Sequence, residues 1–333
     1  MTTKHAKSPC CYALIHRFGH RRRQCSACKR TWSVRQKKRG RPKIRIQADV
    51  LKQVFLEKYT LGHLAKRRSG VGLVNFRHRF RQTLRSFVAR PNPQKLSSGP
   101  LILLADGLFF YFQRRAWVLY LIALKSCTGK TATFLDPILL PERESSERWV
   151  QVLEEAIPLE IRPRIRALVV DNLNGMKKLA KFKGWILQLC HFHLIQKFQI
   201  QHRRQRRVLR GGAMREEIYQ LIRQALEAPN GSLLNNSIAR LTQLAKNPCI
   251  TYRIQAMVRE FLRSISYYRA YKTYPELDLP STTNTIESMN SIIRDLLRRN
   301  HSASSPQSLL QWATALIRLR KKLNCNGKHH QQI

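Results

Sequence analysis

The hydrophobic and polar positions of the chain follow one pattern before about residue 90 and another after residue 100. From 46 to 89, apolar residues recur every three or four positions, which predicts helices. Gly70 and Gly72 lie between two of these helical stretches, as the turn of a helix-turn-helix would place them. From Leu101 onward, the apolar runs LILLADGLFF and AWVLYLIAL instead predict buried strands.

The rest of the second half predicts an alternation of strands and helices. TGKTATFLDP contains a third strand after a turn, and RALVVD (166–171) and WILQLC (185–190) are further strands. The helices that we expect here are 144–157, NGMKKLAKF, a basic helical stretch over 191–271, and two last helices over 283–299 and 306–322. This order of elements predicts an α/β protein with a mixed sheet.

The charge of the chain changes this picture by predicting a partner. There are 62 Lys and Arg against 19 Asp and Glu, a net charge of +43 spread over the whole chain. Such self-repulsion favours a long nucleic-acid track, and the helix-turn-helix stretch favours double-stranded DNA as that nucleic acid. An anionic membrane surface is the alternative, but no apolar stretch is long enough to span a bilayer. The N-terminus lacks the apolar core of a signal peptide, so we expect a cytoplasmic, nucleoid-associated protein with eight reduced, structural or metal-bound cysteines.

Two of the six aspartates are candidates for chemistry. Asp106 and Asp171 end the apolar runs LLAD and LVVD, and active sites of α/β sheets gather at strand ends. A carboxylate there needs a compensating cation. The alternative is an aspartate that caps the next turn. Asp136, which precedes a proline, is better explained as such a turn residue.

A third carboxylate lies in STTNTIESMNSIIRDLL. Glu287 follows Asn284 by three residues and precedes Asn290 by three, so the three share a helix face, while Ile286 and Ile293 turn another face toward the sheet. A solvated helix glutamate is the simpler alternative. Three carboxylates brought together would repel one another unless a divalent cation, Mg²⁺ or Mn²⁺, neutralised them. Two such ions support phosphodiester chemistry.

Asp106, Asp171, the C-x-x-H pair of LCHFH and the T-N-x-x-E motif ending at Glu287 resemble, in this order, the Mutator-type insertion-sequence transposases. The resemblance covers about residues 100–300 and implies a ribonuclease-H-like core with an Asp-Asp-Glu triad. It also implies an all-helical insertion within the 116 residues between Asp171 and Glu287. Asp106, Asp171 and Glu287 would be catalytic and hold the metal, with His193 near the phosphate or the carboxylates.

The LCHFH segment has two further interpretations. Cys190, His191 and His193 could bind zinc, although no partner pair lies nearby in the sequence. Alternatively, His193 could be a buried structural histidine.

The N-terminal cysteines predict a second metal site. Cys25-S-A-Cys28 has the spacing of a zinc knuckle. With S-P-C-C upstream and T-W-S downstream, the segment resembles the small zinc-binding modules at the N-termini of many insertion-sequence transposases. Ser8 replaces the first cysteine of that pattern.

This departure leaves three zinc ligands in register, Cys11, Cys25 and Cys28. The fourth would be Cys10, His5 or His16. The alternative is a degenerate finger that folds without metal.

Two basic helical segments are candidates for DNA contacts. The second helix of the helix-turn-helix would enter the major groove, with Val74, Phe76, Phe80 and Leu84 partly buried. It would offer DNA Asn75, Arg77, Arg79 and Arg81, mostly to phosphates. A helical bundle with a solvated basic face is the alternative. KFQIQHRRQRRVLR (197–210) would form a phosphate track with Arg203, Arg204, Arg206 and Arg207.

These features together predict a DNA transposase that binds terminal inverted repeats, cleaves and transfers strands at element ends and target DNA, and acts as a homodimer or larger. The alternatives are a catalytically silent, domesticated transposase that regulates through DNA binding, or another ribonuclease-H-like nuclease. The expected domains are a zinc-finger-like module (1–40), a helix-turn-helix domain (41–98), the first part of the catalytic core (99–205), the all-helical insertion (206–272), and the last part of the core with a C-terminal helix (273–333).

Overall fold

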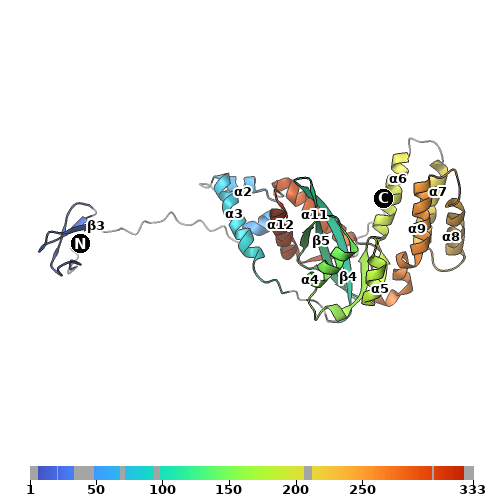
Figure 1. Cartoon of the computed structure of the whole chain (residues 1–333), viewed down its shortest axis with the longest axis horizontal. Helices are drawn as coiled ribbons and strands as arrows, with labels where there is room; N and C mark the ends of the chain where they lie inside the picture. Colours follow the sequence, from blue (N-terminus) through green and yellow to red (C-terminus); the bar gives the residue numbers. More distant parts are fainter. Residues whose placement is uncertain are drawn as a thin grey trace. The chain divides into compact units, whose positions relative to one another are not determined.

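The computed structural model divides the chain into two compact units, Met1–Ile46 and Gln47–Ile333 (Figure 1). The residues that the structure describes are 7–20, 22–33, 49–67, 72–93, 96, 98–205, 212–301 and 304–325, without the side chains of 200–205 and 212–213. None of the described helices combines the length and apolar character needed to cross a membrane.

The first unit is a small antiparallel sheet with almost no apolar core. Its strands are β1 (Ile15–Arg17), β2 (Arg22–Cys25) and β3 (Thr31–Ser33), paired in the order β1-β2-β3. Among the described residues of this unit, only Ser8 and Cys25 are buried. A module this small needs another source of stability, such as a bound metal.

The second unit is built on the mixed sheet that the apolar runs predict, so the α/β class is confirmed. The strands are β4 (Leu101–Phe112), β5 (Arg115–Ser126), β6 (Thr131–Phe134), β7 (Ile138–Pro141), β8 (Ile165–Val170), β9 (Ile186–Leu189) and β10 (Lys322–Asn324). Their order is β10-β6-β5-β4-β8-β9, and β7 also pairs with β5. β4 is antiparallel to β5 and parallel to β8, and β8 is parallel to β9.

The helices lie close to the predicted positions. They are α1 (Asp49–Phe55), α2 (Leu61–Arg67), α3 (Leu73–Val88), α4 (Ser146–Ala156), α5 (Met176–Lys183), α6 (His191–Gln205), α7 (Gly212–Glu227), α8 (Ser232–Leu244), α9 (Tyr252–Tyr268), α10 (Ala270–Thr273), α11 (Asn284–Asn300) and α12 (Pro306–Arg320), with single 3-10 turns at Arg162–Arg164 and Pro275–Leu277. Serines begin two of them. Ser145 caps α4 through the Arg148 N–H, and Ser305 caps α12 through the Ser308 N–H.

Helices cover both faces of the sheet. On one face, Trp149 of α4 packs edge-on against Tyr120 of β5, with ring centroids 4.8 Å apart. On the other, α11 packs against β4 and β5, and its Ile286 and Ile293 are fully buried as their spacing predicts. α7, α8 and α9 pack side by side beyond the sheet (Figure 1).

Helices α1–α3 share a core with α12. The rings of Phe55 (α1) and Phe80 (α3) lie 5.2 and 5.3 Å from that of Trp312 (α12). Asn300 accepts a hydrogen bond from the Leu61 N–H at 3.1 Å. The segment expected as a separate domain over 41–98 is therefore joined by its helices to the same unit as the sheet.

Two details of this region concern the sequence predictions. Phe76, Phe80 and Leu84 are buried, but Val74 is 79% exposed, so its expected partial burial is wrong; it lies on the side of α3 away from α12. Asp136 forms an ion pair with Arg318 of α12, which agrees with its exclusion from the candidate chemistry.

Candidate active site

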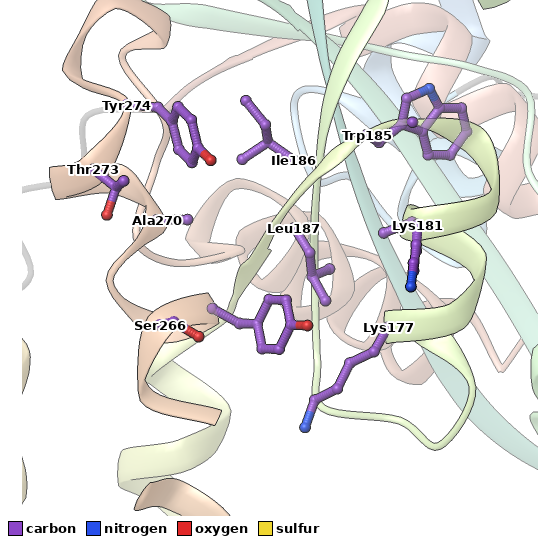
Figure 2. Close-up of a pocket in the computed structure, with 12 residues that line it drawn as sticks. Lys177, Lys181, Trp185, Ile186, Leu187, Ser266, Ala270, Thr273 and Tyr274 are labelled. Atoms are coloured by element: carbon purple, nitrogen blue, oxygen red, sulfur yellow. The ribbon is translucent and has the colours of Figure 1, made fainter. Parts of the chain in front are cut away.

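One hollow of about 380 Å³ lies between α5, β9, α9 and α10 (Figure 2). Its described lining includes Lys177, Lys181, Trp185 and Tyr267, and none of the described lining residues carries a carboxylate. It therefore offers no acidic ligand for a divalent cation.

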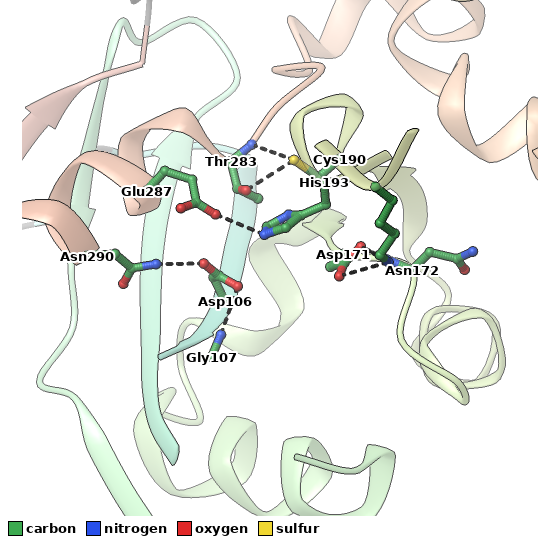
Figure 3. Close-up of polar contacts among 10 residues, drawn as sticks. Asp106, Gly107, Asp171, Asn172, Cys190, His193, Thr283, Glu287 and Asn290 are labelled. Carbon is green, nitrogen blue, oxygen red and sulfur yellow. Dashed lines mark hydrogen bonds and ion pairs between the residues drawn. The ribbon is translucent and has the colours of Figure 1, made fainter. Parts of the chain in front are cut away.

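A second hollow, of about 330 Å³, is lined by all the predicted acidic residues; we call it the acidic hollow. Its lining includes Asp106, Asp171, Glu287, His193 and Glu144. Figure 3 shows the side chains of Asp106, Asp171, Glu287 and His193 converging from β4, the end of β8, α11 and α6.

Asp106 is not at the end of its strand, which corrects the sequence prediction. β4 continues six residues further, to Phe112, because its partner β5 accompanies it to Arg115. The parallel partner β8 does end here. Leu104 pairs with Val169, so Asp106 and Asp171 each lie two residues beyond the last paired positions. The two carboxylates come to the same level of the sheet where β4 and β8 part.

Asp106 is 9% exposed and held by two donors. The Gly107 N–H bonds its Oδ1 at 2.9 Å, and the Asn290 amide bonds its Oδ2 at 2.7 Å. Burial, together with the nearby Glu287 carboxylate, raises the pKa of Asp106 to about 8. A cation beside it would relieve this penalty.

Glu287 lies on the first turn of α11, with Oε1 3.0 Å from Nε2 of His193. Burial works against the charge of Glu287, but His193 holds its pKa below the usual range. Burial also opposes a charge on His193, yet the neighbouring Cys190 and Glu287 side chains raise its pKa to about 11. The pair is therefore an imidazolium facing a carboxylate in the metal-free protein.

The other members of LCHFH have structural roles. The Cys190 thiol lies 3.2 Å from the Thr283 hydroxyl and accepts the Thr283 N–H at 3.3 Å, which ties α6 to the start of α11. Nε2 of the buried His191 lies 2.6 Å from the Tyr268 carbonyl. No described group of potential metal ligands includes Cys190 or His191.

Asp171 directly follows β8, as predicted, and is less closely grouped. Ligand atoms of Asp106, His193 and Glu287 all lie within 4.8 Å of one another, and Asp171 is outside this set. Its carboxylate accepts the Asn172 N–H at 2.6 Å and faces the Lys197 ammonium at 3.3 Å. Lys197 follows His193 by one helical turn, so α6 supplies a cation to each of two carboxylates.

Two residues of the hollow were missed from the sequence. Glu144 accepts the Trp149 indole N–H at 2.7 Å, and burial raises its pKa above the usual range. Nothing local marked it, because α4 and the loop before it bring it to the sheet. Arg294 of α11 was detectable, since it follows Glu287 by two helical turns.

The close group of Asp106, Glu287 and His193 could hold a metal ion. The Nδ1 of His193 and the Oδ1 of Asn290 are buried without a hydrogen-bond partner in the described part of the chain. Carboxylate oxygens are ligands that Mg²⁺ accepts, and unpartnered polar atoms beside them suit a hydrated ion. The donor set therefore fits a divalent cation.

The N-terminal unit brings four cysteines together. The thiols of Cys10, Cys11, Cys25 and Cys28 lie within 4.8 Å of one another and could hold a structural metal such as zinc. Cys10 is thus the fourth member, while His16 pairs with Gln24 in the sheet and His5 lies outside the described residues.

Ser8, in the place of the missing cysteine, is buried against this cluster. Its hydroxyl oxygen accepts the Ala13 N–H at 3.1 Å and the Cys25 thiol at 3.2 Å. Ser8 therefore links the segment around Cys10 and Cys11 to Cys25 by hydrogen bonds.

The predicted DNA-contact residues are only partly described. On α3, Asn75, Arg77 and Arg81 are exposed and Arg79 is half-buried. Arg203 and Arg204 lie in α6 with side chains outside the described part, and Arg206 and Arg207 lie outside the described residues altogether.

Comparison with known proteins gives no match, either to a protein-family model or to a curated protein. Function therefore has to be inferred from the residues and their geometry.

Proposed function

We propose that the protein is a DNA transposase whose ribonuclease-H-like core cleaves and joins DNA strands with divalent metal at the acidic hollow. The observation that carries this proposal is the meeting of Asp106, Asp171 and Glu287 at one hollow, from two parallel strands and a helix 116 residues further along the chain. The sheet order β6-β5-β4-β8-β9, antiparallel then parallel, supports a ribonuclease-H-like fold.

In this proposal, Asp106 and Glu287 hold the cation with Asp171. A divalent cation there would polarise the scissile phosphate and lower the pKa of the attacking water or 3′-hydroxyl. The Asn290 amide fixes the orientation of Asp106. The exposed Arg294 at the edge of the hollow suits a phosphate oxygen.

Two cations of α6 each lie beside one of the carboxylates when metal is absent. His193 faces Glu287 and Lys197 faces Asp171. Each can turn toward a DNA phosphate when metal replaces it on the carboxylate. His193 and Lys197 would thus pair with carboxylates in the metal-free site and with DNA phosphates in the metal-bound site.

The net charge of +43 and the cysteine cluster support DNA as the substrate. In the proposed function the N-terminal unit and α3 bind the terminal inverted repeats. Bringing two ends together requires at least two copies of the chain.

The test uses a supercoiled plasmid that carries the gene with its flanking DNA. We expect nicking and strand-transfer products in Mg²⁺ or Mn²⁺. Asp106→Asn, Asp171→Asn and Glu287→Gln should each abolish cleavage while duplex affinity stays within about threefold, because basic residues dominate that affinity.

The matched control is Asp295→Asn, on the same helix as Glu287 but outside the acidic hollow. It should cleave like the wild type. Cleavage without any strand transfer would favour another ribonuclease-H-like nuclease. Binding without cleavage would favour a silent DNA-binding regulator.

A further inference from the structure

One face of α11 carries a polar stripe whose charge changes sign along the helix. Glu287, Asn290, Arg294 and Arg298 follow one another at spacings of three, four and four residues, so they line one side of the helix. His301 extends the stripe as the residue that caps the C-terminus. The stripe is acidic at the hollow and basic beyond it.

Three hollows follow this stripe and share lining residues. The acidic hollow shares Arg294 with a hollow of about 430 Å³, which Phe110 and Arg298 also line. This second hollow shares His301 and Ser304 with a third, of about 90 Å³. Arg77 and Arg81 of α3, both exposed, line the third hollow. Because neighbouring hollows share these residues, the three lie in series from the acidic hollow along α11 to α3, and we call this series the groove.

The groove beyond the acidic hollow is basic and little neutralised. Among the described residues, no carboxylate lines the second or the third hollow. Arg77, Arg81 and Arg294 form no salt bridge within the described part of the chain. Arg298 shares Asp295 with Arg299. Several guanidinium groups therefore point to an anionic ligand that lies along the groove.

We propose that the DNA strand leaving the acidic hollow lies in this groove, with Arg298, His301, Arg77 and Arg81 on its phosphates. The identity of the strand rests on the proposed function. His301 follows Glu287 by fourteen residues, about 21 Å along the helix, which corresponds to about six nucleotide steps of 3.4 Å. Arg77 and Arg81 thus bind phosphates about six nucleotides from the cleaved bond and do not read bases.

The first experiment measures affinity for a random-sequence duplex against KCl concentration, in EDTA, by fluorescence anisotropy. Each lost phosphate contact makes the negative slope of log affinity against log salt shallower by about 0.9. We expect Arg77→Ala/Arg81→Ala to make it shallower by about 1.8 and Arg81→Ala by about half as much. Arg85→Ala, exposed one turn further on α3 but outside the groove, is the matched control and should leave the slope unchanged.

The second experiment locates the contact. Neutral methylphosphonates are placed singly along the strand that the wild-type protein nicks, and binding is compared between wild type and Arg77→Ala/Arg81→Ala. A methylphosphonate about six nucleotides from the nick should weaken DNA binding by the wild type. It should leave DNA binding by the double variant unchanged.

Equal salt slopes for the wild type and the double variant would overturn the proposal. So would a methylphosphonate effect that depends on Arg77 and Arg81 only on the other strand, or at no phosphate near six nucleotides from the nick. Because the salt experiment needs no cleavage, it gives a result even if the plasmid is never nicked. Failure of the proposed function and failure of the groove are therefore distinguishable.

Discussion

Replacing Asp106 by asparagine should stabilise the metal-free protein. The folded state holds this carboxyl buried beside Glu287, where burial raises its pKa from 3.8 to about 8. Each tenfold difference in proton affinity corresponds to about 1.4 kcal/mol, so the ceiling is about 6 kcal/mol above pH 8. Solvent reaches the hollow and relieves part of this, so we expect about 2–3 kcal/mol, or roughly 5–10 °C in Tm.

The sign follows from proton linkage. Between about pH 4 and pH 8 the folded protein binds a proton at Asp106 that the unfolded chain has released, so this residue lowers stability as pH rises. The asparagine has no such contribution. His193, with its raised pKa, lowers the stability of both proteins above about pH 6.5. The gap in unfolding free energy between Asp106→Asn and the wild type should therefore widen between about pH 4 and 8 and stay constant above pH 8.

The neighbouring hydrogen bonds permit the substitution. Asp106 accepts from the Gly107 N–H and the Asn290 amide. An asparagine can still accept from Gly107. If the Asn290 amide rotates, its otherwise unpartnered Oδ1 accepts the new Nδ2 donor. Asp106→Asn should therefore leave no additional buried polar atom unpartnered.

The assay is urea unfolding in EDTA at about pH 5 and about pH 9. Asp295→Asn, which gives up ion pairs to two arginines, is the control and should gain no stability. Mg²⁺ should then raise the Tm of the wild type more than that of the variant, because it binds the charged site. A gap that is the same at both pH values, or a variant less stable at the higher one, would refute the reasoning.

Two further predictions concern the cysteine cluster and the attachment of α1–α3. The purified protein should contain one zinc per chain, and Cys25→Ser/Cys28→Ser should lose it. Cys249→Ser, which changes an exposed cysteine outside the cluster, is the control and should keep the zinc. Metal analysis that finds no zinc in the wild type would contradict this prediction. Trp312→Ala should cost about 3–5 kcal/mol in urea unfolding, because it removes a buried ring between Phe55 and Phe80, whereas Trp312→Phe should cost less. An unchanged midpoint for Trp312→Ala would mean that α1–α3 do not depend on α12.

Much of the sheet could be predicted because its main strands contain long apolar stretches. The first half of β4 and most positions of β5 and β8 are buried on both faces, so their sequences contain nearly continuous apolar runs. β7 was missed because its residues are half-exposed at a short pairing with β5. The strands of the N-terminal unit were missed because they are three or four residues long and bury almost nothing.

The candidate site was predictable where one element carries the signal. Glu287 and Asn290 share a face of α11, and Ile286 and Ile293 share the buried one, so periodicity alone oriented this helix. Glu144 and Lys197 carry no such signal. Their approach to the hollow depends on how α4 and α6 pack on the sheet, which is a property of the tertiary structure.

In the metal-free protein, the three carboxylates differ in the groups that lie beside them. Asp171 faces Lys197 and Glu287 faces His193, so each has a cation of α6 beside it. Asp106 has neutral donors and a carboxylate neighbour, and its charge is the one that the fold suppresses. In the proposed function, a divalent cation would therefore gain most at Asp106, while it must compete with side-chain cations at the other two. Metal affinity should accordingly rise with pH as Asp106 ionises, and the displaced His193 and Lys197 become available to the DNA phosphates that arrive with the substrate.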